Sequence, residues 1–231
     1  MEIPLYLAMT AVEFSACRAL PNKIGWMACH FSPYGTGLSN LPIKLPERSL
    51  LIVNDSTPVC GHDPELVFEQ LLGIITEQSA AAVLLDLQRQ DNPETQALAG
   101  HLTALSCPVV VSHLYAERLN CPVFLPPIPI NQRPEEYLAP WKGREIWLEA
   151  ALGGMTIRLD DRGSVEKEYS NKEVASLPFY DSDLHCHYLI ETEQDTALIH
   201  LQRSKEDLVH LLRDCAQHGI TTAVGLYQEL K

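Results

Sequence analysis

One stretch, residues 63–89 (DPELVFEQLLGIITEQSAAAVLLDLQR), constrains the fold more than any other part of the chain. Its first half has the features of a helix start. Asp63 suits the N-cap, Pro64 suits the first helical position, and Glu65 suits the positive end of the helix dipole. Apolar residues then recur at helical spacing as far as Ile75. The pattern predicts a helix that leads directly into the next element.

The second half of this stretch predicts a buried strand with polar residues at its end. The run from Ala80 to Leu85 is continuous and apolar, as in a strand that is covered on both faces. Alternation along the strand puts Asp86 and Gln88 on one face and Leu87 on the other. Such residues lie at the carboxyl end of a parallel strand, where α/β barrels and open α/β sheets place their sites.

Short apolar strands alternate with helices along the rest of the chain. The predicted strands are 5–9, 24–31, 49–53, 80–85, 109–112, 123–125, 145–152, 155–159, 187–191, 197–202 and 223–226, of which 187–191 and 197–202 form an antiparallel pair and 155–159 pairs nearby. Besides the helix that begins at Asp63, the predicted helices are 11–20, 94–105, 172–176 and 205–217, and 32–47 is a long loop. About eight parallel strands with some helices missing indicate a compact (β/α)8 TIM-type barrel. A doubly wound open sheet is the alternative.

Composition limits the partners and the number of domains. A chain of 231 residues, 46% hydrophobic and 20% charged, fits one domain covering residues 1–231. The net charge of −13 argues against a nucleic acid and against an anionic membrane surface as partner. No apolar run approaches the ~18 residues of a membrane span. Oligomeric state has no signature in the sequence.

The expected location is the cytoplasm. The first residues are apolar, but they have no basic region and include Glu2 and Glu13, so we expect no signal peptide. The seven cysteines are an odd number without paired spacing. This pattern is typical of thiols in a reducing compartment.

The order of segments resembles the family 18 glycoside hydrolases, and most closely the chitinase-like barrels related to spore-cortex-lytic enzymes. In that family a helix leads into strand four, which ends in DxxDxDxE, and residues 81–88 fall on this frame. Asp86 matches the third aspartate, and Gln88 stands where the family has its catalytic glutamate. Ala81 and Leu84 replace the first two aspartates. The resemblance extends over most of the chain from about residue 24, but only one of these four motif residues is kept.

Other segments agree with the family in order. LLIVND resembles the third strand, EIWLEAAL resembles strand seven, and residues 177–230 resemble the closing section, in which a tyrosine–aspartate segment precedes a hairpin, a helix and strand eight. The resemblance places Tyr180 and Asp181 in that segment. It places Tyr227 where the family usually has a tryptophan beneath the sugar.

The replaced glutamate determines the function that the resemblance implies. In the family, a glutamic acid protonates the leaving oxygen while the acetamido group of the substrate attacks, oriented by the neighbouring aspartate. A glutamine cannot donate a titrating proton, and general acid catalysis typically contributes 10²–10⁴-fold. We therefore expect a protein that binds an amino-sugar-containing carbohydrate with little or no hydrolysis. Asp86, Gln88, Asn54 and Tyr227 would share the cleft.

Two alternatives remain open. The first is an active glycosidase whose acid has moved to Asp55 or Glu229, which requires a carboxyl group of raised pKa near a second one. The second is a non-catalytic interaction or structural protein of sporulating bacteria, with its cleft filled by a side chain such as Trp26 or Tyr34.

Several of these residues also have simpler explanations. Asn54 and Asp55 follow a strand that neighbours the strand of Asp86, but an Asx turn before Pro58 would explain them as well. His30 ends another strand and precedes the long loop that contains Tyr34, although a lone histidine is more often structural.

One further motif resembles a metal site. Asp183, His185 and His187 resemble the opening metal motif of PHP-type phosphoesterases, and both histidines would lie on one strand face. That motif opens its fold and takes its remaining ligands from later segments, whereas only 44 residues follow His187 here. We expect no metal and no cofactor.

Overall fold

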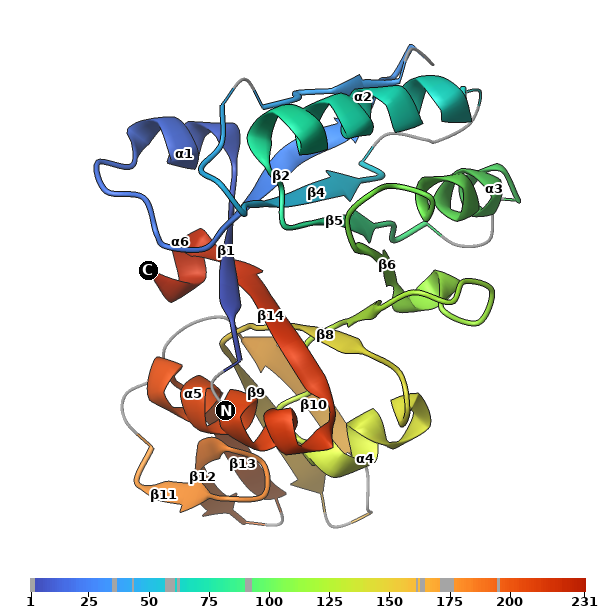
Figure 1. The fold of residues 1–231 in the computed structure, drawn as a ribbon. Coiled ribbons are helices and arrows are strands. Elements are labelled where there is room, and N and C mark those ends of the chain that lie inside the picture. Colours follow the sequence, from blue (N-terminus) through green and yellow to red (C-terminus); the bar gives the residue numbers. More distant parts are fainter. Residues whose placement is uncertain are drawn as a thin grey trace.

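Eight parallel strands form a closed barrel in the computed structural model (Figure 1). The structure describes residues 3–34, 37–42, 44–56, 61, 63–89, 93–160, 162, 165–170, 177–194 and 196–231. In their order around the barrel, the strands are β1 (Leu5–Met9), β2 (Ile24–Phe31), β4 (Leu50–Asn54), β5 (Ala82–Asp86), β6 (Val109–Ser112), β7 (Val123–Leu125), β8 (Ile146–Glu149) and β14 (Ile220–Leu226). β1 pairs with both β14 and β2, which closes the ring. The prediction of a TIM-type barrel is confirmed, and the open sheet is excluded.

The barrel strands are apolar throughout because both of their faces are covered. On β5, Leu84 belongs to the cluster inside the barrel, with Tyr6, Ile52, Phe124 and Trp147. The residues on either side of Leu84 point outward and pack in the layer beneath the helices. The inner cluster fills the barrel toward the amino ends of the strands, and a pocket lies near their carboxyl ends.

Helices connect most of the strands but not all of them. The α-helices are α1 (Ala11–Ala16), α2 (Pro64–Gln78), α3 (Pro93–Leu102), α4 (Pro134–Leu138), α5 (Lys205–Cys215) and α6 (Tyr227–Leu230), and the 3-10 turns are η1 (His113–Tyr115), η2 (Ala139–Trp141) and η3 (Ala216–His218). β2 and β4 are joined by a long connection, in the described residues of which the one regular element is the short strand β3 (Leu38–Ser39), paired antiparallel with β2.

Two helix predictions differ in their outcome. The start of α2 is confirmed, because the Asp63 carboxylate accepts a hydrogen bond of 3.0 Å from the backbone N–H of Glu65. The prediction for residues 11–20 is too long. α1 ends at Ala16 because Cys17 already has an extended backbone, well before Pro21.

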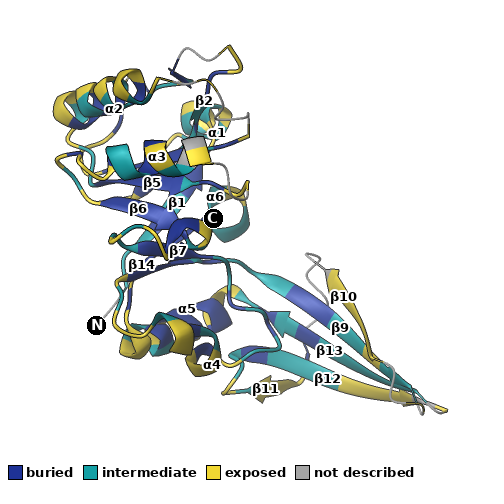
Figure 2. Ribbon diagram, turned by 90° about the vertical axis from the view of Figure 1, so that its right-hand side faces the viewer, coloured by how far each residue is buried: buried dark blue, intermediate teal, exposed yellow. Residues whose placement is uncertain are grey.

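A second, antiparallel sheet is inserted between β8 and α5. Its strands are β9 (Gly153–Asp160), β10 (Val165–Ser170), β11 (Phe179–Asp181), β12 (Cys186–Glu193) and β13 (Thr196–Arg203), in the spatial order β10-β9-β13-β12-β11. Figure 2 shows this sheet extending away from the barrel, with α5 beside its base. The predicted pairing of 187–191 with 197–202 is confirmed, but β10 and β11 were not predicted as strands. The predicted helical piece 172–176 lies outside the described residues.

The base of the second sheet is fixed to the barrel by one buried arginine. The guanidinium of Arg203 donates to the backbone oxygens of Ile128, Leu184 and His185 at 3.0, 3.1 and 3.3 Å. Ile128 belongs to the proline-rich loop after β7, so this side chain joins that loop to the turn between β11 and β12. None of the helices in the described part of the chain is long and apolar enough to cross a membrane.

Candidate functional site: a carboxyl pocket at the barrel mouth

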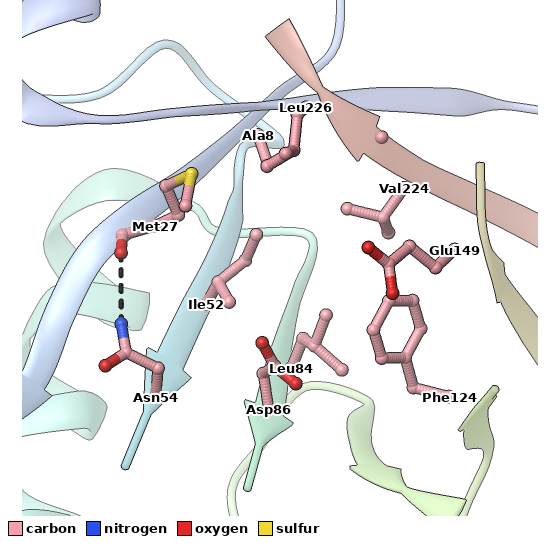
Figure 3. Close-up of a pocket in the computed structure, with 11 residues that line it drawn as sticks. Ala8, Met27, Ile52, Asn54, Leu84, Asp86, Phe124, Glu149, Val224 and Leu226 are labelled. Carbon is pink, nitrogen blue, oxygen red and sulfur yellow. Dashed lines mark hydrogen bonds between the residues drawn. The ribbon is translucent and has the colours of Figure 1, made fainter. Parts of the chain in front are cut away.

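A small pocket of about 80 Å³ lies inside the barrel near the carboxyl ends of its strands (Figure 3). It is lined by Ala8, Met27, Ile52, Asn54, Leu84, Asp86, Phe124, Glu149, Val224, Gly225 and Leu226. Three of these side chains are polar and the others form apolar walls. A cavity needs about 10–15 Å³ to hold one water, so this pocket can hold a few waters or one small substituent of a larger ligand.

Asp86, the last residue of β5, points into this pocket as the sequence predicts for the end of the fourth barrel strand. The side-chain amide of Gln88 donates a hydrogen bond of 2.5 Å to the Asp86 carboxylate. Burial raises the pKa of Asp86, the hydrogen bond from Gln88 lowers it, and the negative charge of Asp55 raises it further. Burial is the largest of these effects, so the net pKa is raised.

Glu149 is a second carboxyl group in the pocket, and it was not predicted as a site residue. It ends β8 and points into the same pocket as Asp86 from a different strand (Figure 3). Burial, with the negative charges of Asp86 and Glu229, raises the pKa of Glu149 to about 7. The sequence prediction extended this strand to residue 152, because apolar residues follow Glu149 in EIWLEAAL, so its likeness to Asp86 at the end of β5 was not visible.

Asn54 is held in a fixed orientation at the edge of the pocket. Its side-chain amide donates to the backbone oxygens of Met27 and Cys29, each at 3.2 Å. Its side-chain oxygen accepts a hydrogen bond of 3.1 Å from the backbone N–H of Ser56, which is the Asx turn. Asn54 therefore lines the pocket and shapes the loop after β4 at the same time.

Asp55 is buried in the loop after β4 and does not line the pocket. Its two carboxylate oxygens accept hydrogen bonds from the backbone N–H groups of Gln88 and Arg89, at 3.1 and 2.8 Å. The Arg89 side chain donates in return to the backbone oxygens of Asp55 and Ser56. These contacts join the loops after β4 and β5 and set the position of the segment that carries Gln88.

The remaining predicted site residues lie outside the pocket. His30 is bonded through its ring to the backbone oxygen of Phe31 and to Asn40, and Tyr34 is 86% exposed. Trp26 is buried and donates to the backbone oxygen of Asn40, so neither of the two aromatic residues predicted to fill the cleft lines it.

Tyr227 and Glu229 do not extend the last strand, because β14 ends at Leu226, as predicted, and a turn of helix, α6, begins at Tyr227. The Tyr227 hydroxyl lies 3.4 Å from the Cys17 sulfur. Glu229 lines a separate groove of about 340 Å³ between the proline-rich loop and the second sheet, while its charge acts on Glu149. We expected Asp86, Gln88, Asn54 and Tyr227 to share one cleft, whereas Asp86 and Asn54 line the pocket and Gln88 contacts it through Asp86.

Tyr180 and Asp181 belong to β11, in the second sheet. The Asp181 carboxylate accepts from the backbone N–H groups of Asp183 and Leu184 and so closes the turn before β12. The Tyr180 hydroxyl lies 3.2 Å from a ring nitrogen of His185.

The two histidines of the motif that resembles a metal site, His185 and His187, each face one carboxylate on α5. His185 lies 3.3 Å from Asp214, and His187 lies 3.0 Å from Asp207. Among the described residues, no group of three or more histidine, cysteine, aspartate or glutamate side chains is arranged to hold a metal ion. The contacts explain both histidines as links between the second sheet and α5.

Solved structures with the same architecture include spore cortex-lytic enzymes and a chitinase. The spore cortex-lytic enzyme SleL of Bacillus cereus matches 100% of this chain and 72% of its own, with a TM-score of 0.61 and 8% identity. SleL of Bacillus megaterium QM B1551 matches 100% and 71%, with a TM-score of 0.58 and 9% identity. The fold is family 18 glycoside hydrolase-like.

The chitinase ChiW of Paenibacillus sp. str. FPU-7 is also similar, over 98% of this chain and 41% of that one, with a TM-score of 0.58 and 8% identity. No protein-family model and no curated protein sequence matches the chain. The family 18-like fold confirms the resemblance in segment order. At these identities it concerns architecture, and the chemistry of the site depends on the residues of this chain.

Proposed function

We propose that the barrel mouth binds an amino-sugar-containing carbohydrate through Asp86 and Asn54. The observation that carries this proposal is the Asp86 carboxylate in a pocket with apolar walls, at the end of the fourth strand of a family 18-like barrel. The pocket is too small for a sugar ring and large enough for a ring substituent, so the ring would lie over the mouth. Asp86 would accept a hydrogen bond from that substituent, and Asn54 would line the other side.

Gln88 has an amide where the family has its acid, which supports binding of the sugar without hydrolysis by this residue. It cannot supply a proton to a leaving group, and it is bonded to Asp86. A cytoplasmic location is part of the same proposal. The six cysteines in the described part of the chain are free thiols, which fits a reducing compartment.

Calorimetric titration with short N-acetylglucosamine oligomers and with muropeptides tests the binding proposal. The wild type should show saturable binding, and Asp86→Ala should lose at least about tenfold in affinity, since one charge-assisted hydrogen bond contributes about 1.5–3 kcal/mol. Glu135→Gln removes an exposed carboxylate of α4 and serves as the matched control. Binding that survives in Asp86→Ala would move the site elsewhere, and no binding of any of these sugars would refute the proposal.

A further inference from the structure

Binding of a carbohydrate through Asp86 and Asn54 leaves Glu149 without a role, although it lines the same pocket. No described residue forms a hydrogen bond or an ion pair with the Glu149 side chain, whereas Asp86 is bonded to Gln88 and Asn54 to backbone oxygens. A carboxyl group among apolar walls without a partner is costly to keep ionised. Glu149 is therefore the polar group in this pocket that is not used to build the site.

The position of Glu149 is suited to a reacting bond at the mouth. Glu149 and Asp86 are the last residues of their strands, so both carboxyl groups lie at the open end of the barrel. They come from different strands and point into one pocket, as Figure 3 shows. Two carboxyl groups close to the scissile bond are the usual equipment of a glycosidase, one of them acting as acid and the other as carboxylate.

The environment of Glu149 favours the protonated form near neutrality. Apolar walls raise its pKa, and the charges of Asp86 and Glu229 raise it further, to about 7. A general acid works best when its pKa is close to the working pH. A pair of carboxyl groups in which one is protonated and the other ionised gives the acid and the base of such a site.

We propose that Glu149 is the general acid of a glycoside-hydrolysing site at the barrel mouth and replaces the glutamate that Gln88 lacks. The proposal rests on the carbohydrate-binding function proposed above and adds turnover to it. Glu149 gives its proton to the glycosidic oxygen as the bond between that oxygen and the anomeric carbon breaks. A water oxygen bonds to the anomeric carbon, and the proton of that water passes to the Asp86 carboxylate. Return of this proton to Glu149 restores the site, and one water is consumed for each bond broken.

Turnover of two substrate types by Glu149→Gln tests this role. The substrates are the N-acetylglucosamine tetramer, whose leaving oxygen needs a proton, and the 2,4-dinitrophenyl glycoside of N-acetylglucosamine, whose leaving group departs without one. Glu149→Gln should lose 10²–10⁴-fold in kcat/KM on the tetramer and only a few-fold on the aryl glycoside. Glu135→Gln on the surface should match the wild type. Thermal unfolding of each variant controls for folding.

The pH profile gives a second, independent readout on the wild type. Its kcat/KM on the tetramer should fall above a pH of about 7, as Glu149 loses its proton. Glu229→Gln removes one charge that raises the pKa of Glu149, so this falling limb should move to lower pH. The pH profiles of the wild type and of Glu229→Gln test the role of Glu149 even if Glu149→Gln does not fold.

Three results would overturn the proposal. The first is wild-type turnover by Glu149→Gln, and the second is an equal loss on both substrates. The third is the absence of any turnover by the wild type while calorimetry shows that it binds the tetramer, which would leave the binding function standing. If the tetramer neither binds nor turns over, both proposals fail together.

Discussion

Asp86 and Glu149 point into one small pocket, although they end different barrel strands separated by β6 and β7. The negative charge of Asp86 disfavours ionisation of Glu149. The barrel closes around two acidic groups that the unfolded chain keeps apart. This arrangement links the proton uptake of the pocket to the stability of the fold.

We predict that Glu149→Gln reduces the pH dependence of stability. The pKa of Glu149 rises from its ordinary value of 4.5 to about 7 in the fold, so its contribution favours folding below pH 4.5 and is lost as the pH rises through 7. The difference between variant and wild type in the free energy of unfolding should change in favour of the variant by at most about 3 kcal/mol between pH 4 and 8. Urea unfolding at both pH values measures it, with Glu135→Gln as control. A constant difference would contradict the raised pKa.

Gln88→Ala should raise the pKa of Asp86. The Gln88 amide donates to the Asp86 carboxylate and stabilises its charged form, so the loss of this donor leaves burial and the charge of Asp55 unopposed. Carbon-13 NMR titration of the aspartate carboxyl groups measures the shift. Asp55→Asn is the opposite control and should lower the same pKa. A decrease in Gln88→Ala would show that the hydrogen bond is not made in solution.

Asp55→Ala should destabilise the protein by about 2–4 kcal/mol, because two backbone N–H groups lose a charged acceptor in a buried place. Asp55→Asn keeps one acceptor oxygen and should lose less. Urea unfolding at pH 7 measures both variants. A loss below about 1 kcal/mol in Asp55→Ala would mean that water replaces the carboxylate easily.

Arg203→Lys should cost about 2–3 kcal/mol despite the retained charge. The guanidinium reaches three backbone oxygens from one planar group, and an ammonium cannot reproduce this geometry. Hydrogen exchange should report faster opening of β11 and β12, while the barrel strands β4 and β5 remain protected. Uniform loss of protection would show that the sheet and the barrel unfold as one unit.

Two glycine-to-alanine replacements should change the stability of the protein in opposite directions. A β-carbon on Gly225 would lie 2.6 Å from the backbone oxygen of Ala150 and would also meet Leu230, so Gly225→Ala should destabilise by several kcal/mol. A β-carbon on Gly73, within α2, meets nothing within 4 Å. Gly73→Ala should stabilise by about 0.5–1 kcal/mol. Thermal unfolding of the two variants tests the pair, and a destabilised Gly73→Ala would contradict it.

The barrel could be predicted from sequence because the patterns that specify its helices and strands are local. In 63–89, the N-cap, the helical spacing and the apolar run are all read within a few residues, and the structure reproduces them in α2 and β5. The place of Asp86 follows from the end of its strand. The strand of Glu149 was predicted too long, as 145–152, and only barrel closure shows that Glu149 shares a pocket with Asp86.

The second sheet was harder to predict because its pairings are long-range. β9 pairs with β13, some forty residues later, and β10 is a polar edge strand with little apolar alternation. The end of the last strand at residue 226 was predicted, but the sequence did not show that Tyr227 begins a turn of helix, α6.

The pairing of β1 with β14 has a consequence for the synthesis of the protein. Leu5 lies opposite Ala223, so β1, which is synthesised before the other barrel strands, waits for β14, the last of them, before its free edge is covered. Until then, seven strands form an open sheet that can add a strand from another chain. Slow translation of the second sheet would lengthen this interval. We therefore expect the yield of soluble protein to depend on chaperones that hold nascent chains, more than the stability of the finished barrel would indicate.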